Sequence, residues 1–219
     1  MKTHRTLHGA RRALIAAAAA GAAGATLSGC FPLAAGGMAY GALVVTDRRT
    51  LGAQTEDTGI EVKARAQLSQ EIRQSGGIGV VSFNRKVLLY GQVADDAARR
   101  TAEQVVARLE NVRTVHNELA VSGRTSIGTA ANDTAITTKV KAALVDAKDL
   151  QANAFKVITE AGIVYLMGIV TRAEGDRAAS LASRTSGVLR VVTVFEYVTE
   201  DELARIVYQS KESRDGAKK

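Results

Sequence analysis

The chain offers few side chains that could carry out covalent or metal chemistry. Cys30 is its only cysteine, and beyond residue 30 its only histidine is His116. Zinc sites are built largely from Cys and His, and a Ser-His-Asp triad needs a histidine beside its nucleophile. The acidic pair Asp95 and Asp96 opens an expected helix, where adjacent side chains diverge and negative charge suits the helix dipole. We therefore expect no catalytic residue, metal site, cofactor or small-molecule substrate, and we interpret His116 as a surface or inter-domain residue.

The residues before Cys30 indicate another use for its thiol. Basic residues near the start precede an Ala-rich apolar run over residues 13–25, too short for a bilayer span of about 20 apolar residues and typical of an export signal. Its last residues, Leu27-Ser28-Gly29-Cys30, resemble the bacterial lipobox. This resemblance implies that residues 1–29 are a lipoprotein signal peptide, that the Cys30 thiol takes a diacylglycerol, and that the new amino end is acylated as well, for example with palmitate. Two or more acyl chains hold a protein stably on a membrane.

The residues after Cys30 bear on sorting and on the link to the folded part. Phe31 stands where an aspartate usually retains Gram-negative lipoproteins in the inner membrane, so the resemblance implies the periplasmic face of the outer membrane. Residues 30–55 are rich in Gly, Ala and Thr, which predicts a lipidated tether. The apolar residues Leu43, Val44 and Val45 could instead pack as a strand or turn on the first domain.

The charge of the exported part is modest. The four basic residues of the signal account for much of the formal net charge, and their removal lowers it from +7 to +3; they are Lys2, Arg5, Arg11 and Arg12. A net charge of +3 does not argue for nucleic-acid binding. About 190 residues remain, enough for one ordinary domain or two small ones.

The body of the chain contains an internal repeat, residues 57–119 matching residues 133–195. Asp57-Thr58, Lys63 and Leu68 recur 76 residues later as Asp133-Thr134, Lys139 and Leu144. Leu89-Tyr90-Gly91-Gln92-Val93 recurs 77 residues later as Leu166-Met167-Gly168-Ile169-Val170. One insertion and one compensating deletion near loops are expected of divergent duplicates. The repeat predicts two domains.

Both copies predict the same order of elements. A helix comes first, indicated by an Asp-Thr cap and by apolar residues every three or four positions. Thr58 and Glu61 have the spacing of a capping box in the first copy, and Thr171 and Glu174 cap the second helix of the second copy. The strands and second helices are expected at residues 79–83, 87–93, 95–109 and 112–121, then at 155–159, 163–170, 171–183 and 188–197. The order αββαβ predicts an α+β fold in which each three-stranded sheet carries two helices on one face.

These patterns resemble a known family. An Asp-Thr pair, a helix, a strand ending in an apolar-Gly-x-Val pattern and a final turn-Val-x-x-Val strand are similar to the BON domain. The likeness covers residues 56–123 as a first and 132–198 as a second BON domain, and is closest over residues 133–140 and 164–168. Two BON domains behind a lipobox resemble dual-BON outer-membrane lipoproteins. This resemblance implies a non-enzymatic protein that binds anionic phospholipid, chiefly phosphatidylglycerol, and supports envelope integrity and localisation to division sites.

The resemblance implies that the first helix of the second domain binds the lipid. In a helix after Asp133, Ile136, Val140, Ala143 and Leu144 share the inward face. The expected phospholipid-binding residues lie on the flanks and outer side: Ala135, Thr138, Lys139, Lys141, Ala142 and Val145. Small or apolar positions beside two lysines suit lipid headgroups. The family often has a tryptophan in place of Ala135, and the acids Asp133, Asp146 and Asp149 dilute the lysines.

Other interpretations stay open. In the first copy, Lys63 and Arg65 lie beside Glu61, so we expect that domain to bind lipid less and to dock on the second domain or on protein. As an alternative function, both domains form a periplasmic scaffold that docks on outer-membrane assembly machinery or cell-wall components. Within residues 199–219, the pattern predicts a short helix to residue 210 that covers a sheet or groove or engages a partner, and then a disordered tail.

Overall fold

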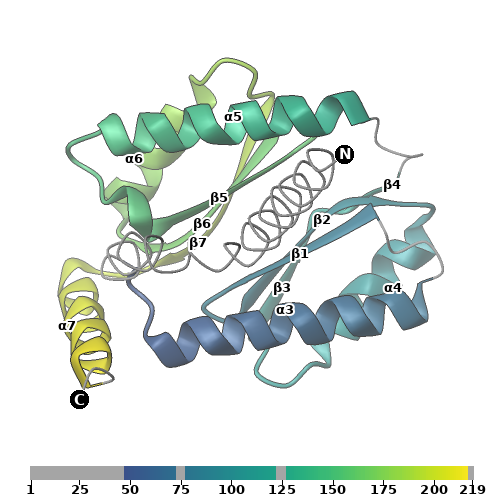
Figure 1. Cartoon of the computed structure of the whole chain (residues 1–219), viewed down its shortest axis with the longest axis horizontal. Coiled ribbons are helices and arrows are strands. Elements are labelled where there is room, and N and C mark those ends of the chain that lie inside the picture. Colours follow the sequence, from purple (N-terminus) through teal and green to yellow (C-terminus); the bar gives the residue numbers. More distant parts are fainter. Residues whose placement is uncertain (1–46, 73–76, 122–126, 217–219) are drawn as a thin grey trace, which may run out of the picture. The chain divides into compact units, whose positions relative to one another are not determined.

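The computed structural model describes residues 47–72, 77–121 and 127–216, which belong to one compact unit spanning residues 45–219 (Figure 1). The predicted signal peptide, Cys30, the predicted tether up to residue 46 and the last three residues lie outside the described residues. The predicted strand or turn at Leu43, Val44 and Val45 lies outside them too.

The described residues form two successive αββαβ domains and a C-terminal helix. The first domain contains α3 (Leu51–Glu71), β1 (Ile78–Phe83), β2 (Lys86–Val93), α4 (Asp96–Ala107), β3 (Thr114–Asn117) and β4 (Ala120–Val121). The second contains α5 (Ile127–Asp146), the short 3-10 helix η3 (Ala152–Ala154), β5 (Phe155–Glu160), β6 (Ile163–Val170), α6 (Arg172–Ser183) and β7 (Arg190–Tyr197). Helix α7 (Glu200–Gly216) follows. The predicted α+β class and element order are confirmed.

Each sheet is built around its second strand. Strand β2 pairs antiparallel with β1 and parallel with β3 and β4, and β6 pairs antiparallel with β5 and parallel with β7. The registers agree between the copies, since Val80 faces Leu89 and Val157 faces Leu166. The strand expected over residues 112–121 is divided into β3 and β4. Between them, the Glu118 amide still bonds the Leu89 carbonyl oxygen at 2.9 Å.

Two helices cover one face of each sheet and form its core (Figure 1). In the first domain this core joins residues of α3, such as Ile60 and Leu68, to Val87 and Leu89 of β2. In the second it joins Ile136, Val140 and Leu144 of α5 to strand and α6 residues. Burying a side chain of this size stabilises a fold by about 1.5–3 kcal/mol.

The opposite faces of the two sheets share a third core. The side chains of β2 and β6 that point away from the helices are buried together with apolar residues of both domains, and Tyr90 and Tyr165 pack with ring centroids 6.1 Å apart. The cluster contains Val81, Phe83, Leu88, Tyr165, Met167, Ile169 and Val194. Polar contacts join the domains beside it: Asn84 Nδ2 bonds Glu196 Oε2 at 2.8 Å, and Lys86 Nζ bonds the Phe195 carbonyl oxygen at 2.9 Å. The two repeats therefore form one body with a continuous apolar interior.

The first helix begins earlier than expected. Thr50 is the N-cap of α3, and its hydroxyl accepts a hydrogen bond from the Ala53 amide at 3.2 Å. The predicted capping box at Thr58 and Glu61 is wrong, since both residues lie inside α3. Thr58 donates to the Gln54 carbonyl oxygen, and Glu61 accepts the Ser82 amide at 3.0 Å. The last residues of the expected tether are therefore helical.

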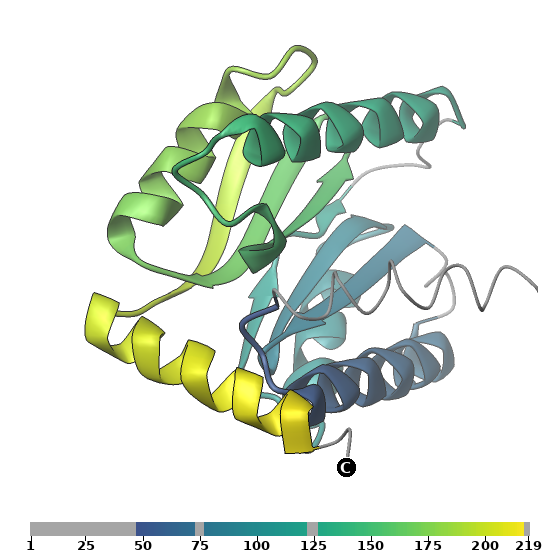
Figure 2. The ribbon, with the colours of Figure 1, turned by 60° about the vertical axis from the view of Figure 1, so that its left-hand side comes forward.

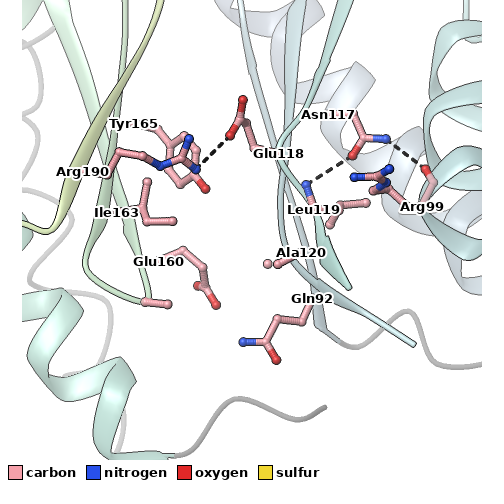
Figure 3. Close-up of a pocket in the computed structure, with 12 residues that line it drawn as sticks. Gln92, Arg99, Asn117, Glu118, Leu119, Ala120, Glu160, Ile163, Tyr165 and Arg190 are labelled. Carbon is pink, nitrogen blue, oxygen red and sulfur yellow. Dashed lines mark hydrogen bonds and ion pairs between the residues drawn. The ribbon is translucent and has the colours of Figure 1, made fainter. Parts of the chain in front are cut away.

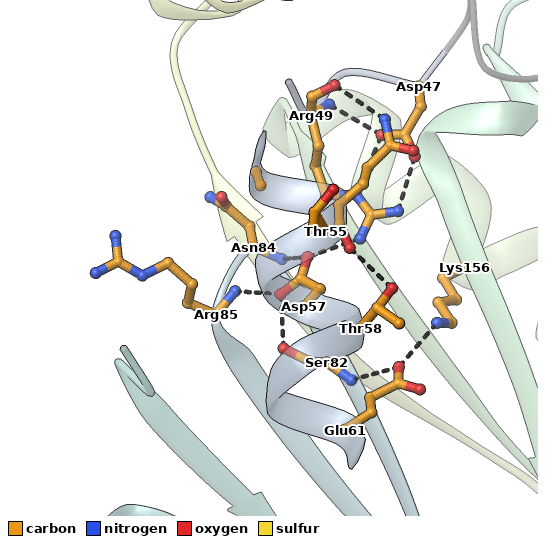
Figure 4. Close-up of polar contacts among 12 residues, drawn as sticks. Asp47, Arg49, Thr55, Asp57, Thr58, Glu61, Ser82, Asn84, Arg85 and Lys156 are labelled. Atoms are coloured by element: carbon orange, nitrogen blue, oxygen red, sulfur yellow. Dashed lines mark hydrogen bonds and ion pairs between the residues drawn. The ribbon is translucent and has the colours of Figure 1, made fainter. Parts of the chain in front are cut away.

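Asp57 and its counterpart Asp133 hold hairpin turns rather than helix ends, and Figure 4 shows the contacts of Asp57. Asp57 is buried and accepts hydrogen bonds from the amides of Asn84 at 2.7 Å and Arg85 at 2.8 Å. Asp133, also buried, accepts the amides of Ala161 at 2.7 Å and Gly162 at 2.8 Å. All four turn residues have positive φ, as a two-residue type I′ hairpin requires. The prediction that these aspartates cap the helices is wrong, since both lie inside their helices. Each points toward the sheet, where its carboxylate accepts the amides of the hairpin turn.

The second helices begin as predicted. Asp95 caps α4 by accepting the Ala98 amide at 2.7 Å. Thr171 and Glu174 form a reciprocal capping box at the start of α6, with hydrogen bonds of 3.3 and 3.0 Å.

The C-terminal helix is longer than predicted. Helix α7 runs to Gly216, so the expectation of a disordered tail from residue 211 is wrong as far as residue 216. Arg214 is buried and donates to the Asp47 carbonyl oxygen at 2.8 Å, which fixes the last turns. Figure 2 shows this end of α7 beside the beginning of α3. Leu203 is buried and Ile206 packs on the inter-sheet core, whereas Val207 is 39% exposed.

Candidate functional site

Helix α5 buries the residues expected on its inward face and exposes those expected on its outer side. Ile136, Val140 and Leu144 are buried against β5 and β6, and Ala143 is half-buried. The six residues predicted to bind phospholipid are all exposed: Ala135, Thr138, Lys139, Lys141, Ala142 and Val145. Val145 is 67% exposed although it is a large apolar residue. The outer side of α5 is therefore a lightly apolar strip with a lysine on each flank.

The acidic residues near this strip oppose the lysines less than expected. Asp133 is buried, and its carboxylate accepts hydrogen bonds from the amides of the β5–β6 hairpin turn. Asp149 pairs with Arg177 at 2.9 Å. Within the described ranges, neither Lys139 nor Lys141 forms an ion pair. Of the three acids, Asp146 alone keeps an exposed carboxylate with no basic partner among the described residues.

The equivalent face of α3 presents its basic residues differently. Arg65 pairs with Glu61 at 3.1 Å and donates to the Val80 carbonyl oxygen at 2.8 Å. Lys63 lies 3.8 Å from a carboxylate oxygen of Glu110. These cations are engaged by the first domain itself, so the two repeats present different charges to their surroundings.

Glu61 also connects the two domains. Its Oε1 lies 3.4 Å from Lys156 Nζ on β5, in the network of Figure 4. This contact supports the part of our expectation in which the first domain docks on the second.

Arg48 joins the start of the folded part to the second domain, a contact that the sequence did not reveal. Its guanidinium forms two hydrogen bonds with Glu174, of 2.5 and 2.8 Å, and one of 2.7 Å with the Ile169 carbonyl oxygen. Arg48 is 4% exposed. Burial alone would raise the pKa of Glu174, but the hydrogen bonds from Arg48 and Thr171 and the charge of Arg48 lower it below the ordinary value.

The adjacent Arg49 connects the same segment to the first domain. It pairs with Asp57 at 2.7 Å, and its guanidinium carbon lies 4.1 Å from the centre of the Phe83 ring. We call Asp47, Arg48 and Arg49 the clasp. Their partners lie in both domains and in α7, so no local sequence pattern could have identified them.

A cavity of about 230 Å³ lies between the sheet edges of the two domains (Figure 3). Glu118 of the first domain and Arg190 of β7 pair across it at 3.2 Å. Burial and, to a lesser degree, Asp133 raise the pKa of Glu160, and burial raises that of Tyr165 to about 12. The amide oxygen of Gln92 is buried without a hydrogen-bond partner. The lining combines opposite charges with apolar side chains and presents no nucleophile with a neighbouring base.

The other residues singled out from the sequence, His116 and the pair Asp95 and Asp96, have contacts that suit a structural role. His116 is a surface residue of β3, and the partial burial of its ring and the nearby Lys86 lower its pKa. Asp96 pairs with Arg99 at 2.9 Å beside the capping Asp95. Among the residues that the structure describes, no group of three or more His, Cys, Asp or Glu side chains is placed to hold a metal ion. No helix in the same ranges is long and apolar enough to span a bilayer.

Comparison with known proteins assigns the two repeats to one family. The family model described as "BON domain" matches residues 56–123 and residues 132–199. The outer membrane lipoprotein DolP of Haemophilus influenzae is 38% identical over 174 residues, which cover 78% of this chain and 90% of the relative.

Two further relatives have different names. The 21 kDa hemolysin of Actinobacillus pleuropneumoniae is 34% identical and is aligned over 69% of this chain and 79% of its own length. The osmotically-inducible protein Y of Escherichia coli is 32% identical, over 69% of this chain and 77% of its own length. None of these names denotes an enzyme. The chain belongs to the BON-domain family, as a protein with two BON domains of the DolP type.

Proposed function

We propose that this protein is a lipid-anchored component of the outer membrane whose second BON domain binds anionic phospholipid, phosphatidylglycerol above all, through the outer side of α5. The observation that carries this proposal is the pair of exposed, unpaired lysines, Lys139 and Lys141, on either flank of a strip of small and apolar residues. Lysine stems lie along such surfaces while their ammonium groups reach phosphates.

The magnitudes favour a weak contact that depends on the anchor. Each lysine near an anionic surface contributes about 1 kcal/mol, so Lys139 and Lys141 together strengthen binding roughly thirtyfold. This is insufficient for stable attachment by itself. Acyl chains on Cys30 would make the contact of α5 with the same membrane intramolecular, and a high effective concentration then makes a weak contact sufficient.

The location rests on the lipobox and on the relatives. The name of the Haemophilus influenzae protein places that relative in the outer membrane as a lipoprotein, and Leu27-Ser28-Gly29-Cys30 provides the corresponding modification signal here. In this proposal residues 1–29 are removed, Cys30 is acylated, and the BON domains lie on the periplasmic face, where they support envelope integrity and localise to division sites. Mass spectrometry of the native protein tests the anchor, since an intact leader or an unmodified Cys30 thiol would refute it.

Vesicle co-sedimentation of residues 45–219, which form a compact unit without the acyl chains, tests the lipid contact when the lipid is in large enough excess to reveal a weak contact. Binding should rise with the phosphatidylglycerol content, weaken as salt is added, and be lost in the double variant Lys139→Glu/Lys141→Glu. The matched control is Arg205→Glu/Lys211→Glu, which makes the same charge change on exposed positions of α7. The control should keep its binding.

Two results would contradict the lipid contact. Equal loss in both double variants would mean that net charge, and not the α5 surface, determines binding. Absence of binding at every phosphatidylglycerol content would favour the alternative, a scaffold for outer-membrane assembly proteins or cell-wall components. In that case the exposed side chains of Val207 and Tyr208 on α7 are the first surface to examine.

A further inference from the structure

Leu189 is the most exposed of the large apolar side chains that the structure describes. It is 80% exposed, against 67% for Val145 and 59% for Val62. It ends the turn of residues 184–189 between α6 and β7. Its amide donates to the Gly162 carbonyl oxygen at 2.9 Å, which holds its backbone against the β5–β6 turn. Leu189 is therefore exposed although its backbone is fixed by a hydrogen bond.

The Leu189 turn is attached to α5, the helix of the proposed lipid contact. Gly187 lies against Ile136 of α5, since a Cβ atom added to Gly187 would come within 3.0 Å of the Ile136 Cγ1 atom. The β5–β6 turn beneath Leu189 is bonded to Asp133 of α5 through the amides of Ala161 and Gly162. A movement of α5 toward a surface would carry Leu189 with it.

Strand alternation places Leu189 on the same side of the sheet as α5. Val191 of β7 packs in the core between the sheet and the helices, and Val192 packs in the core between the two sheets. Leu189 immediately precedes β7, and continuing the alternation of the strand by this one residue gives it the orientation of Val191. Figures 1 and 2 show the connection between α6 and β7 extending past α5 at the outer end of the domain.

The charges around the turn suit an anionic surface. Arg184, at the start of the turn, is exposed and has no acidic partner in the described part of the chain. Lys139 lies one helical turn beyond Ile136 and is unpaired as well. Three acids of the adjoining elements are engaged or face elsewhere: Asp133 is buried, Glu160 lines the cavity between the domains, and Glu118 pairs with Arg190. An exposed apolar side chain with basic residues in its own turn and on the adjacent helix suits an interfacial membrane anchor.

We propose that Leu189 is a second element of the membrane contact, an apolar side chain that enters the interface of an anionic bilayer while α5 lies on its surface. This inference rests on the proposed function of α5. It adds to electrostatic attraction an apolar contribution that salt does not screen. Full burial of a leucine corresponds to roughly a tenfold gain in affinity or more.

The chain has no tryptophan, which allows a direct test. Leu189→Trp in residues 45–219 introduces a single tryptophan at the proposed anchor. On vesicles containing phosphatidylglycerol its fluorescence should shift to the blue and become protected from acrylamide, whereas vesicles of phosphatidylcholine alone should leave it unchanged. Val62→Trp on α3, at an exposed apolar position of the first domain, is the matched control and should stay quenchable.

A second variant excludes the possibility that the introduced tryptophan itself creates the contact. Leu189→Glu should weaken sedimentation with these vesicles at least roughly tenfold, and Val62→Glu should not. Thermal unfolding of both variants should match the unsubstituted protein, since both side chains are exposed.

The outcomes separate this inference from the function on which it rests. If the Leu189→Trp protein sediments with the vesicles but its tryptophan stays accessible to acrylamide, the anchor is refuted and the α5 contact stands. The same conclusion follows if Leu189→Glu binds like the unsubstituted protein. If the unsubstituted protein does not sediment at all, both proposals fail.

Discussion

Replacing Asp133 by alanine tests whether one carboxylate in each repeat holds a hairpin turn onto the first helix. Asp133 accepts the amides of Ala161 at 2.7 Å and of Gly162 at 2.8 Å. A hydrogen bond to a charged group contributes about 1.5–3 kcal/mol. Water can replace the bond to exposed Ala161, but the Gly162 amide is buried and would lose its partner. We expect Asp133→Ala to lower the free energy of unfolding by about 3 kcal/mol.

Urea and thermal unfolding of residues 45–219, followed by circular dichroism, measure this loss. For a protein of this size, about 3 kcal/mol corresponds to a fall in Tm of roughly 6–12 °C. Hydrogen exchange should accelerate at the Gly162 amide before it does in β6. The control is Asp149→Ala, which removes an exposed carboxylate paired with Arg177 and should cost less than about 1 kcal/mol.

The reasoning fails if Asp133→Ala costs no more than Asp149→Ala. It also fails if exchange at the Gly162 amide is unchanged, since the turn would then be held by its own backbone preferences. In either case the two aspartates that begin the sequence repeat would need another explanation.

Two further predictions concern the packing of the second domain and the clasp. Gly168→Ala places a Cβ atom 2.6 Å from the Ala154 carbonyl oxygen and should destabilise by about 1–3 kcal/mol in urea unfolding, whereas Gly216→Ala, with open space around it, should be neutral. Arg48→Met leaves Glu174 without its ion pair and should cost about 2–4 kcal/mol, a value reduced for the partial exposure of Glu174. The pKa of Glu174 is lower in the folded state than in the unfolded one, so its contribution is present above the ordinary value of 4.5 and is lost as the pH falls below it. Arg48→Met should therefore flatten the dependence of stability on pH in this acidic range, and an unchanged slope would show that Arg48 is not the cause of the pKa shift.

The parts of the fold predicted correctly from the sequence are those with local signals. The capping box of Thr171 and Glu174 involves residues three apart, and the apolar spacing of Ile136, Val140 and Leu144 identifies the inward face of one helix. The exposed residues on the outer side of α5 follow from the same helical geometry. The duplication added a check, because a pattern that occurs twice at one spacing is less subject to chance.

The errors arose where a residue's partner lies far away in the sequence. Asp57 and Asp133 have the residue type of a helix cap, but their hydrogen-bond partners are in turns 27 to 29 residues later. Arg48 pairs with Glu174 across 126 residues, and nothing near Arg48 distinguishes it from a basic residue in a tether. A local pattern gives the chemistry of such side chains and leaves their partners unspecified.

One signal for the packing of the two sheets was present in the sequence. Residues 163–170, Ile-Val-Tyr-Leu-Met-Gly-Ile-Val, contain no charged side chain, so β6 has no polar face. A strand covered on both sides reads as a continuous apolar run, whereas a strand with one face in water alternates. The run alone predicts a strand, and the structure shows that the sheet of the first domain covers its second face.

The clasp has a mechanical consequence for a protein held by its amino-terminal side. Arg48 is bonded to Glu174 at the start of α6, and Arg49 is bonded to Asp57 of α3. The Asp47 carbonyl oxygen accepts a hydrogen bond from Arg214 near the end of α7. A pull arriving along the backbone from residues before 47 is thus divided among three anchorage points before it can unwind the first turn of α3. If the protein is anchored as proposed, thermal motion of the two BON domains relative to the bilayer applies force to the clasp. Because the clasp contacts both domains and α7, the two repeats would move together and their sheets would stay packed on each other.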